Sequence, residues 1–235
     1  MENDGIVELV VLNRDSLGSR AYQSIRRGLM TGAFKPGQEL LLRNLANDLG
    51  ISITPVREAL LRLVSEKALT ANGSRSIRVP VLTPERFLEI RDLRVELEGK
   101  AAEAATLKMD NRTINQLVET QQEYDATRAR GDIKGTLTIN ERFHFMLYEA
   151  AQMPVLYGII ESLWVQVGPV ITRLHDEPRR PLSERHEHQD VVQGLRARDP
   201  RYVRQALASD IVRASAIILQ RLDTADTDIA SLSVG

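Results

Sequence analysis

The sequence predicts a mainly α-helical fold, in which a small N-terminal unit of three helices and a β-hairpin precedes an antiparallel α-helical bundle of about six helices. Two short amphipathic segments joined by a glycine turn, between residues 42 and 66, predict a helix-turn-helix within the first unit. After residue 84 apolar residues recur at helical spacing, with no strand pattern. Breaks rich in proline, glycine and aspartate divide this second region into segments that suit a bundle.

The composition is that of a two-domain globular protein. A length of 235 residues suits two domains, and 43% hydrophobic residues allow a sizeable core. The absence of cysteine excludes disulfides and thiolate metal sites, and it suits a reducing cytoplasm. No apolar run approaches the roughly 18 residues of a membrane span, and the acidic start predicts that there is no signal peptide.

The N-terminal unit is expected to consist of helices at 20–32, 42–50 and 54–66 and a hairpin at 69–79. Gly50 can end the second helix, because glycine tolerates the left-handed conformation. Ser52 or Thr54 can cap the third helix. The dipeptide Asn72-Gly73 is typical of a hairpin turn. This order of elements is that of a winged helix-turn-helix, which places its second short helix in the major groove of DNA.

Charge is distributed unevenly along the chain. The net charge of −1 hides a net charge of +6 at residues 20–80, where ten lysines and arginines face four acids. The flanking segments 1–19 and 81–235 carry net charges of −3 and −4. The basic segment coincides with the helix-turn-helix, as binding to phosphates requires.

The most specific motif is Leu45-Ala46 followed by Ser52-x-Thr-Pro-Val-Arg-Glu-Ala-Leu60. These residues resemble the signature of the GntR family of bacterial transcription regulators. The resemblance covers residues 20–80, and residues 81–222 resemble, less specifically, the helical FCD ligand-binding domain of the family's FadR-type branch. Two positions depart from the family pattern: Ile53 stands where an arginine is usual, and Ser76 stands where the wing usually has a glycine.

The expected DNA-binding residues lie on the helix-turn-helix and in the wing. Arg57 should face outward near the N-terminus of the reading helix, where base edges are met. The full expected set is Arg43, Ser52, Thr54, Arg57, Gly73 and Arg75. The resemblance implies that this domain binds a palindromic, double-stranded operator as a homodimer, because two-fold proteins read two-fold sites.

The bundle helices are expected at 84–108, 111–129, 133–151, 154–175, 182–198 and 200–222. They define an effector-binding domain at 84–222, for which Thr83 is a suitable N-cap. Residues 1–19 and 223–235 are expected to be tails.

Four polar residues interrupt apolar helical stripes and are therefore expected inside the bundle: Asn140, His144, His188 and Asp210. His188 lies eleven residues before the turn at Asp199 and Asp210 lies eleven after it, so the two share one height in an antiparallel hairpin. A buried carboxylate needs a partner, and imidazoles with a carboxylate suit a divalent transition metal such as zinc or nickel. The alternative is a metal-free pocket in which Asp210 hydrogen-bonds one or both histidines.

The resemblance bears on this metal site. Metal-binding members of the FadR-type branch use Asp-x-x-x-His on one helix and a histidine on each of two later helices. In this chain Asn140-x-x-x-His144, His188 and Asp210 stand at those positions. The set still contains one carboxylate, so the charge of the ligands stays at −1, but the carboxylate is at Asp210 and an amide stands at Asn140. The resemblance therefore implies a retained but altered metal site.

Arg94 lies on the apolar stripe of the first bundle helix and, by the resemblance, matches the arginine of an Arg-x-x-Leu-Glu-type segment. Beside a metal it would hold the carboxylate of a small organic-acid effector bidentately. The alternative is an internal ion pair with Glu98, four residues on. Tyr148 and Trp164 complete the expected effector-binding set, although both also suit a plain core role.

The sequence thus predicts a cytoplasmic, DNA-binding transcription regulator, usually a repressor in this family, whose operator affinity an organic acid controls. An enzyme is disfavoured, because His186-Glu-His188 places its histidines two residues apart and not on one helix face. A DNA-binding protein that works without an effector remains as an alternative.

Overall fold

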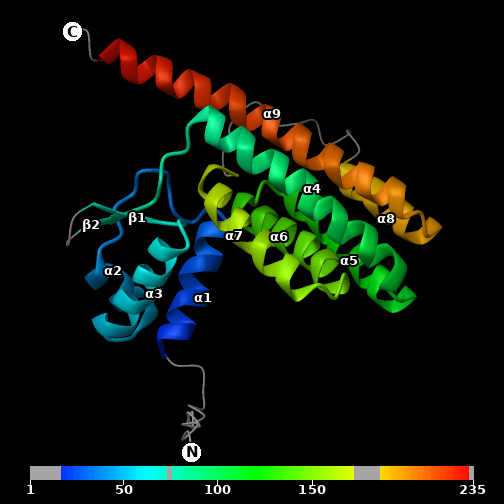
Figure 1. Ribbon diagram of the computed structural model, residues 1–235, viewed down its shortest axis with the longest axis horizontal. Coiled ribbons are helices and arrows are strands. Elements are labelled where there is room, and N and C mark those ends of the chain that lie inside the picture. Colours follow the sequence, from blue (N-terminus) through cyan, green and yellow to red (C-terminus); the bar gives the residue numbers. More distant parts are fainter. Residues whose placement is uncertain (1–16, 73–75, 172–185, 233–235) are drawn as a thin grey trace, which may run out of the picture.

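The computed structural model describes residues 17–72, 76–171 and 186–232, with side chains as far as residue 222. The described chain is mainly helical and divides into a small N-terminal head and a larger bundle (Figure 1). The head contains α1 (Leu17–Met30), α2 (Leu42–Leu49), α3 (Ile53–Ser65), β1 (Thr70–Asn72) and β2 (Ser76–Arg78). The bundle contains α4 (Pro84–Lys108), α5 (Asn111–Ala129), α6 (Ile133–Ala150), α7 (Pro154–Ile171), α8 (Glu187–Ala197) and α9 (Pro200–Leu232).

The head folds around the contact between α1 and α3. Ile25 and Leu29 of α1 are buried, as are Leu60 and Leu63 of α3, so two apolar helix faces pack together. Gly50 ends α2 with a φ of +64°, and its backbone N–H donates to carbonyl oxygens of the last turn. The predicted glycine stop is therefore confirmed, and it turns the chain directly into α3.

The wing begins as an antiparallel pair in which Thr70 faces Arg78 and Asn72 faces Ser76. The chain before α2 joins this pair, since the backbone N–H of Leu40 donates to the carbonyl oxygen of Ile77 at 2.8 Å. The two strands of the hairpin predicted at 69–79 are thus paired, and they lie near α2 on the side of the head away from the bundle (Figure 1), whereas the expected turn at Asn72-Gly73 lies outside the described residues.

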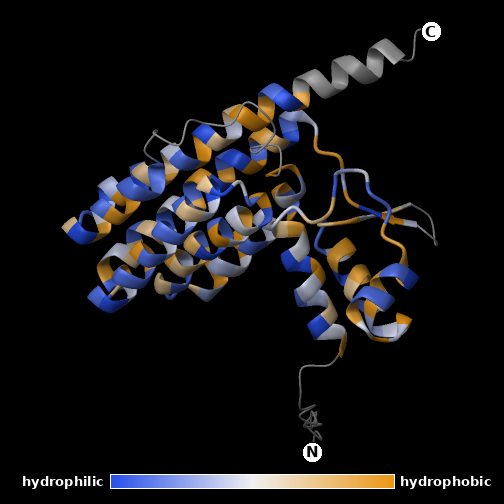
Figure 2. Cartoon of the chain, turned by 180° about the vertical axis from the view of Figure 1, so that it is seen from behind, coloured by the Kyte–Doolittle hydropathy of each residue, from blue (hydrophilic) through white to orange (hydrophobic). Residues whose placement is uncertain are grey.

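The bundle starts at Thr83, whose side chain accepts a hydrogen bond from the backbone N–H of Arg86 at 3.3 Å, as the predicted N-cap should. α9 packs along both α4 and α8. The turn between α8 and α9 passes through Arg198, which adopts the left-handed conformation with a φ of +56°. Hydrophilic and hydrophobic residues alternate along the bundle helices, as helices with one buried face require (Figure 2).

Some element boundaries differ from the expected ones. α1 starts at Leu17, earlier than residue 20, and α9 continues to Leu232, where a tail from residue 223 was expected. The reason for the second difference is in the chain itself: no glycine or proline occurs between Pro200 and Gly235, so nothing interrupts the helix. The described part of α8 begins at Glu187, and residues 172–185 lie outside the described chain.

The head and the bundle meet where α1 packs on α7 (Figure 1). A Cβ on Gly168 would lie 2.1 Å from the carbonyl oxygen of Leu29, so the two helices approach as closely as a glycine permits. Arg26 and Glu161 form an ion pair of 2.6 Å beside this contact. A cleft of about 380 Å³ opens next to it, between α1, α6 and α7.

α7 is the one described helix that is long and apolar enough to cross a membrane, over its 18 residues from Pro154 to Ile171. This differs from the expectation that no such stretch occurs. Within the fold, 56% of the helix is buried, and it packs against α1 and α4. The apolar character of α7 is therefore that of a core helix.

Candidate functional site

The first candidate site is the outer face of α2 and α3. Arg43, Ser52, Thr54 and Arg57 are all exposed there, while Val56 on the opposite face is fully buried. Neither Arg43 nor Arg57 has an ion pair with any described residue. Ser52 is the N-cap residue of α3 but makes no capping hydrogen bond with its side chain. The face thus offers unneutralised cations and a hydroxyl at a helix N-terminus, which suits DNA phosphates and base edges.

The wing part of the expected set cannot be placed in the same way, because Gly73 and Arg75 lie outside the described residues. Arg78 of β2 is described, and it pairs with Glu39 at 3.1 Å. The DNA-binding assignment of the individual residues stays a prediction.

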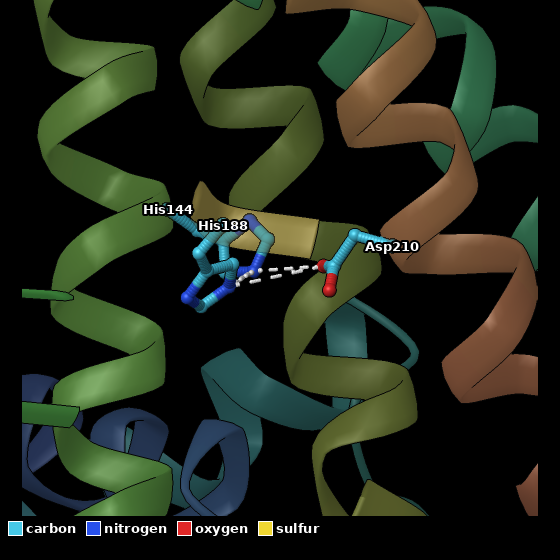
Figure 3. Close-up of side chains that lie close together, drawn as sticks. All are labelled: His144, His188 and Asp210. Atoms are coloured by element: carbon cyan, nitrogen blue, oxygen red, sulfur yellow. Dashed lines mark hydrogen bonds and ion pairs between the residues drawn. The ribbon is translucent and has the colours of Figure 1, made fainter. Parts of the chain in front are cut away.

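The second candidate site is a polar centre inside the bundle, formed by His144 of α6, His188 of α8 and Asp210 of α9 (Figure 3). His144 Nε2 lies 3.2 Å from His188 Nε2 and 3.3 Å from Asp210 Oδ2, and His188 Nε2 lies 3.9 Å from the same oxygen. The three residues are 2%, 0% and 9% exposed. Helix α6 and the consecutive helices α8 and α9 therefore direct their donor atoms to one point in the core.

Hydrogen bonds on the far side of each imidazole control which nitrogen carries the proton. His188 Nδ1 lies 2.8 Å from Oε1 of Gln121, an oxygen that can only accept, so Nδ1 must be protonated. Tyr148 donates its hydroxyl proton to Glu98, so the Tyr148 oxygen accepts from His144 Nδ1 at 3.0 Å. Both rings, when neutral, then direct the lone pair of Nε2 into the centre.

Two lone pairs and a carboxylate that face one another require a positive charge between them. Burial, and next His186, lower the pKa of His188 well below its usual range, so this ring is neutral at physiological pH. Burial alone would raise the pKa of Asp210, but the hydrogen bond with His144 and the nearby His188 hold it well below its usual range. A cation bound between these groups, or a proton shared among them, would supply this charge.

The donor separations fit a metal. Bonds of about 2.0–2.1 Å to a tetrahedral zinc ion place neighbouring ligand atoms about 3.3 Å apart. The separations of 3.2 and 3.3 Å around His144 Nε2 match this value, and the third, 3.9 Å, needs only a small side-chain adjustment. With two imidazoles and one carboxylate, the donor set also suits zinc or nickel chemically.

A second buried network borders the polar centre. The guanidinium of Arg94 contacts both carboxylate oxygens of Glu98, at 2.6 and 3.4 Å, and lies 4.6 Å from the ring of Trp164. Trp164 Nε1 donates to Glu98 at 3.0 Å, and Tyr148 donates to the same carboxylate. Of the two roles considered for Arg94, the ion pair with Glu98 is the one that is formed.

Asn140, the fourth expected ligand, stays a prediction. Asn140 is only half-buried, and no hydrogen bond joins it to His144, His188 or Asp210 in the described chain. His186 lies beside the centre instead, with Nδ1 3.9 Å from Asp210 Oδ1 and Nε2 3.1 Å from the hydroxyl of Tyr124. His186 is the N-cap residue of α8, so helical periodicity does not determine the direction of its side chain.

Gln121 was missed at the sequence level, although a signal for it exists. It interrupts the buried stripe of α5 formed by Ile114, Leu117 and Tyr124, as the histidines interrupt theirs. The same test, a polar residue on an apolar face, would have selected it.

The family described as "Bacterial regulatory proteins, gntR family" matches residues 17–79, and the family described as "FCD domain" matches residues 89–213. The chain is 34% identical over 208 residues to the HTH-type transcriptional regulator McbR of Escherichia coli (strain K12), covering 88% of this chain and 94% of that protein. The solved structure of E. coli McbR/YncC superimposes with a TM-score of 0.82 at 32% identity, over 88% of this chain and 99% of that one. A putative GntR regulator from Rhodococcus sp. RHA1 shares the fold, with a TM-score of 0.68 at 22% identity over 86% of this chain and 97% of its own.

Proposed function

The chain belongs to the GntR family of bacterial regulatory proteins and carries an FCD domain, and on this premise we propose that it is a metabolite-responsive repressor. As a member of this family it is a DNA-binding transcription regulator, and its relatives are regulators, not enzymes. The proposal adds that a small organic acid bound in the bundle changes the affinity for the operator. It also adds that the protein works in the cytoplasm as a homodimer.

The proposed operator contact uses the exposed face of α2 and α3. Arg57 would read a base edge in the major groove, and Arg43, Ser52 and Thr54 would contact the adjacent backbone. Gly73 and Arg75 would contribute from the wing. Because a palindrome presents two half-sites about 34 Å apart, two heads are needed, and light scattering should report a dimer at micromolar concentration.

The observation that carries the proposed effector site is the convergence of two imidazole lone pairs on a buried carboxylate. His144, His188 and Asp210 would hold a divalent ion such as zinc or nickel. When bound, the ion would supply a Lewis-acidic position for an oxygen ligand. Asn140 would be the fourth ligand, and the imidazole of His186, whose Nδ1 lies 3.9 Å from Asp210 Oδ1, is a further candidate beside the centre.

The proposed effector is an anion, because the bound ion and Arg94 would each offer positive charge to it. Arg94 lies within the same buried network, and its ion pair with Glu98 leaves further guanidinium N–H groups for a carboxylate. Tyr148 and Trp164 contact Glu98 and would line the same site. A carboxylate bound to the metal and to Arg94 would compete with Glu98 for this arginine.

α7 offers a direct route from this site to the head. Trp164 borders the centre, and Glu161 and Gly168 of the same helix contact α1 through the ion pair with Arg26 and the close approach to Leu29. A ligand that moves Trp164 would move these contacts as well. The head would then turn relative to the bundle, which changes the spacing of the two reading helices in a dimer.

The metal-free alternative rests on the same geometry with a proton in place of the ion. In that case Asp210 hydrogen-bonds one or both histidines, with His144 Nε2 3.3 Å from its Oδ2, and the centre is a structural polar network. A regulator without an effector is the corresponding functional alternative.

One experiment separates these alternatives. Full-length protein is purified without a metal-affinity step, its zinc and nickel contents are measured, and operator DNA is titrated before and after chelation. We expect about one metal ion per chain and an operator affinity that depends on it. A metal content near zero after growth with added zinc, together with identical titrations, would contradict the metal-linked function.

A further inference from the structure

Gln121 is a buried polar residue of α5 to which neither the sequence pattern nor the proposed function gives a role. It is 5% exposed, and its Oε1 lies 2.8 Å from His188 Nδ1. The carboxamide oxygen can only accept, so this hydrogen bond places the proton of the ring on Nδ1. The other nitrogen, Nε2, then faces His144 Nε2 and Asp210 with a free lone pair.

The other half of the same amide is unsatisfied. Gln121 Nε2 is buried and has no hydrogen-bond partner in the described chain. A buried N–H group without a partner is unfavourable, so a purely structural glutamine at this position would be expected to have both ends paired.

The arrangement around His144 is analogous. There Tyr148 accepts from Nδ1 of the ring and is itself oriented by Glu98. Hydrogen bonds from the outer nitrogen of a metal-binding histidine commonly orient the ring and select the tautomer. Two such bonds, made from α5 and from α6, converge on the two imidazoles of one centre.

We propose that Gln121 is a positioning residue of the metal centre: its Oε1 holds His188 in the tautomer that offers Nε2 to a divalent ion. This inference rests on the metal centre of the proposed function.

The test uses full-length protein and zinc ions as the probe. The variants are Gln121→Met, which removes the acceptor at similar size, and Gln121→Glu, which keeps an acceptor for His188 Nδ1. Gln122→Met is the matched control, because Gln122 is the neighbouring residue and is exposed. Zinc affinity is measured by competition with a chromophoric chelator, and the tautomer of His188 is read from long-range ¹H–¹⁵N spectra of the metal-free protein.

We expect Gln121→Met to weaken zinc binding by about 10–100-fold, as loss of such an outer hydrogen bond does elsewhere. Gln121→Glu should stay much nearer to the wild type, and Gln122→Met should be unchanged. If Gln121 had only a structural role, Gln121→Glu would bind zinc more weakly than Gln121→Met, because a buried glutamate is the more disruptive substitution. The wild-type spectra should show the proton of His188 on Nδ1.

The outcomes are distinguishable. If the wild-type protein binds no zinc, the metal centre of the proposed function fails, and this inference fails with it. If the wild type binds zinc but Gln121→Met binds it equally well, or Gln121→Glu is the weaker variant, only the role of Gln121 is overturned. Should Gln121→Met not fold, the tautomer of the wild type decides: a proton on Nε2 of His188 overturns the inference.

Discussion

The exposed outer face of α2 and α3, which we call the reading face, and the polar centre of the bundle differ in whether their charged groups are paired. Arg43 and Arg57 are exposed and have no ion pair with a described residue, whereas Arg94 is buried and paired with Glu98. In water an unpaired guanidinium costs little, and it is available for a phosphate or a guanine. In the core every charge needs a partner, so the polar centre had to be built from several helices at once.

The first and largest expected effect concerns Asp210, the only anion of the polar centre. Asp210→Ala should abolish metal-dependent stabilisation, which for the wild type amounts to about 4 kcal/mol when free metal exceeds Kd by 1,000-fold. Melting temperatures with and without chelator provide the measurement. Glu119→Ala on the exposed side of α5 is the control and should keep the wild-type response to chelator. A chelator response that survives in Asp210→Ala would exclude Asp210 as a ligand.

The second prediction concerns the junction between the two regions. Gly168→Ala places a methyl group against the backbone of Leu29, so α1 must move, and we expect a loss of about 1–3 kcal/mol in unfolding free energy. The operator affinity should change as well, because α1 carries the head.

Gly158→Ala on the same helix is the control for that substitution. Its Cβ would meet nothing within 4 Å, so the change should stabilise α7 by about 0.5–1 kcal/mol. Equal melting temperatures and equal operator titrations for the two alanine variants would show that the junction is loose and does not couple the two regions.

The third prediction tests the exposed face alone. Arg57→Ala should weaken specific operator binding by about 1–3 kcal/mol if the guanidinium reads a guanine, while the melting temperature stays unchanged. Fluorescence anisotropy with operator and with scrambled DNA separates the sequence-specific part of the binding free energy from the part that comes from phosphate contacts. Arg201→Ala, an exposed arginine of the bundle, should bind as the wild type does. An Arg57→Ala variant with full specific affinity would remove this residue from the reading set.

The smallest expected effect is the pH dependence of the junction. Burial, and next Glu161, raise the pKa of Tyr157 to about 12, whereas an unfolded tyrosine titrates near about 10. The folded state therefore holds this proton more tightly, so the contribution to stability is complete below about pH 10 and is lost as the pH rises towards about 12.

Tyr157→Phe removes this titration, so its unfolding free energy should fall less steeply than that of the wild type between about pH 9 and about pH 11. Urea unfolding across this range provides the measurement, with Tyr202→Phe, another half-buried tyrosine, as the control. Parallel pH profiles for the wild type and Tyr157→Phe would contradict the assigned cause.

Much of the fold could be predicted because its signals are local. Gly50 ends α2, Thr83 caps α4, and breaks such as Asp199-Pro200 separate the bundle helices. The reading face follows from the same local information, since the exposed and buried sides of α3 are set by helical spacing within thirteen residues. The motif that carries the family resemblance lies in this same segment.

The polar centre was only partly predictable. Helical spacing placed His144, His188 and Asp210 on buried faces, and antiparallel pairing placed two of them at one height. Helical spacing does not apply to His186, because this residue is the N-cap of α8 and stands outside the helix, and Asn140 is only half-buried on the helix that carries His144.

What the sequence by itself determined is the order of the elements, the basic reading face, and the helices that carry the buried polar residues. What only the tertiary structure decided is which atoms meet: Gln121 of α5 with His188 of α8, Tyr148 with Glu98, and α7 with α1 through Gly168. The physical reason is that helical periodicity assigns a residue to a face but not to a partner. Partners depend on how helices distant in the chain pack together, and a hydrogen bond requires that packing to be correct within a fraction of an ångström.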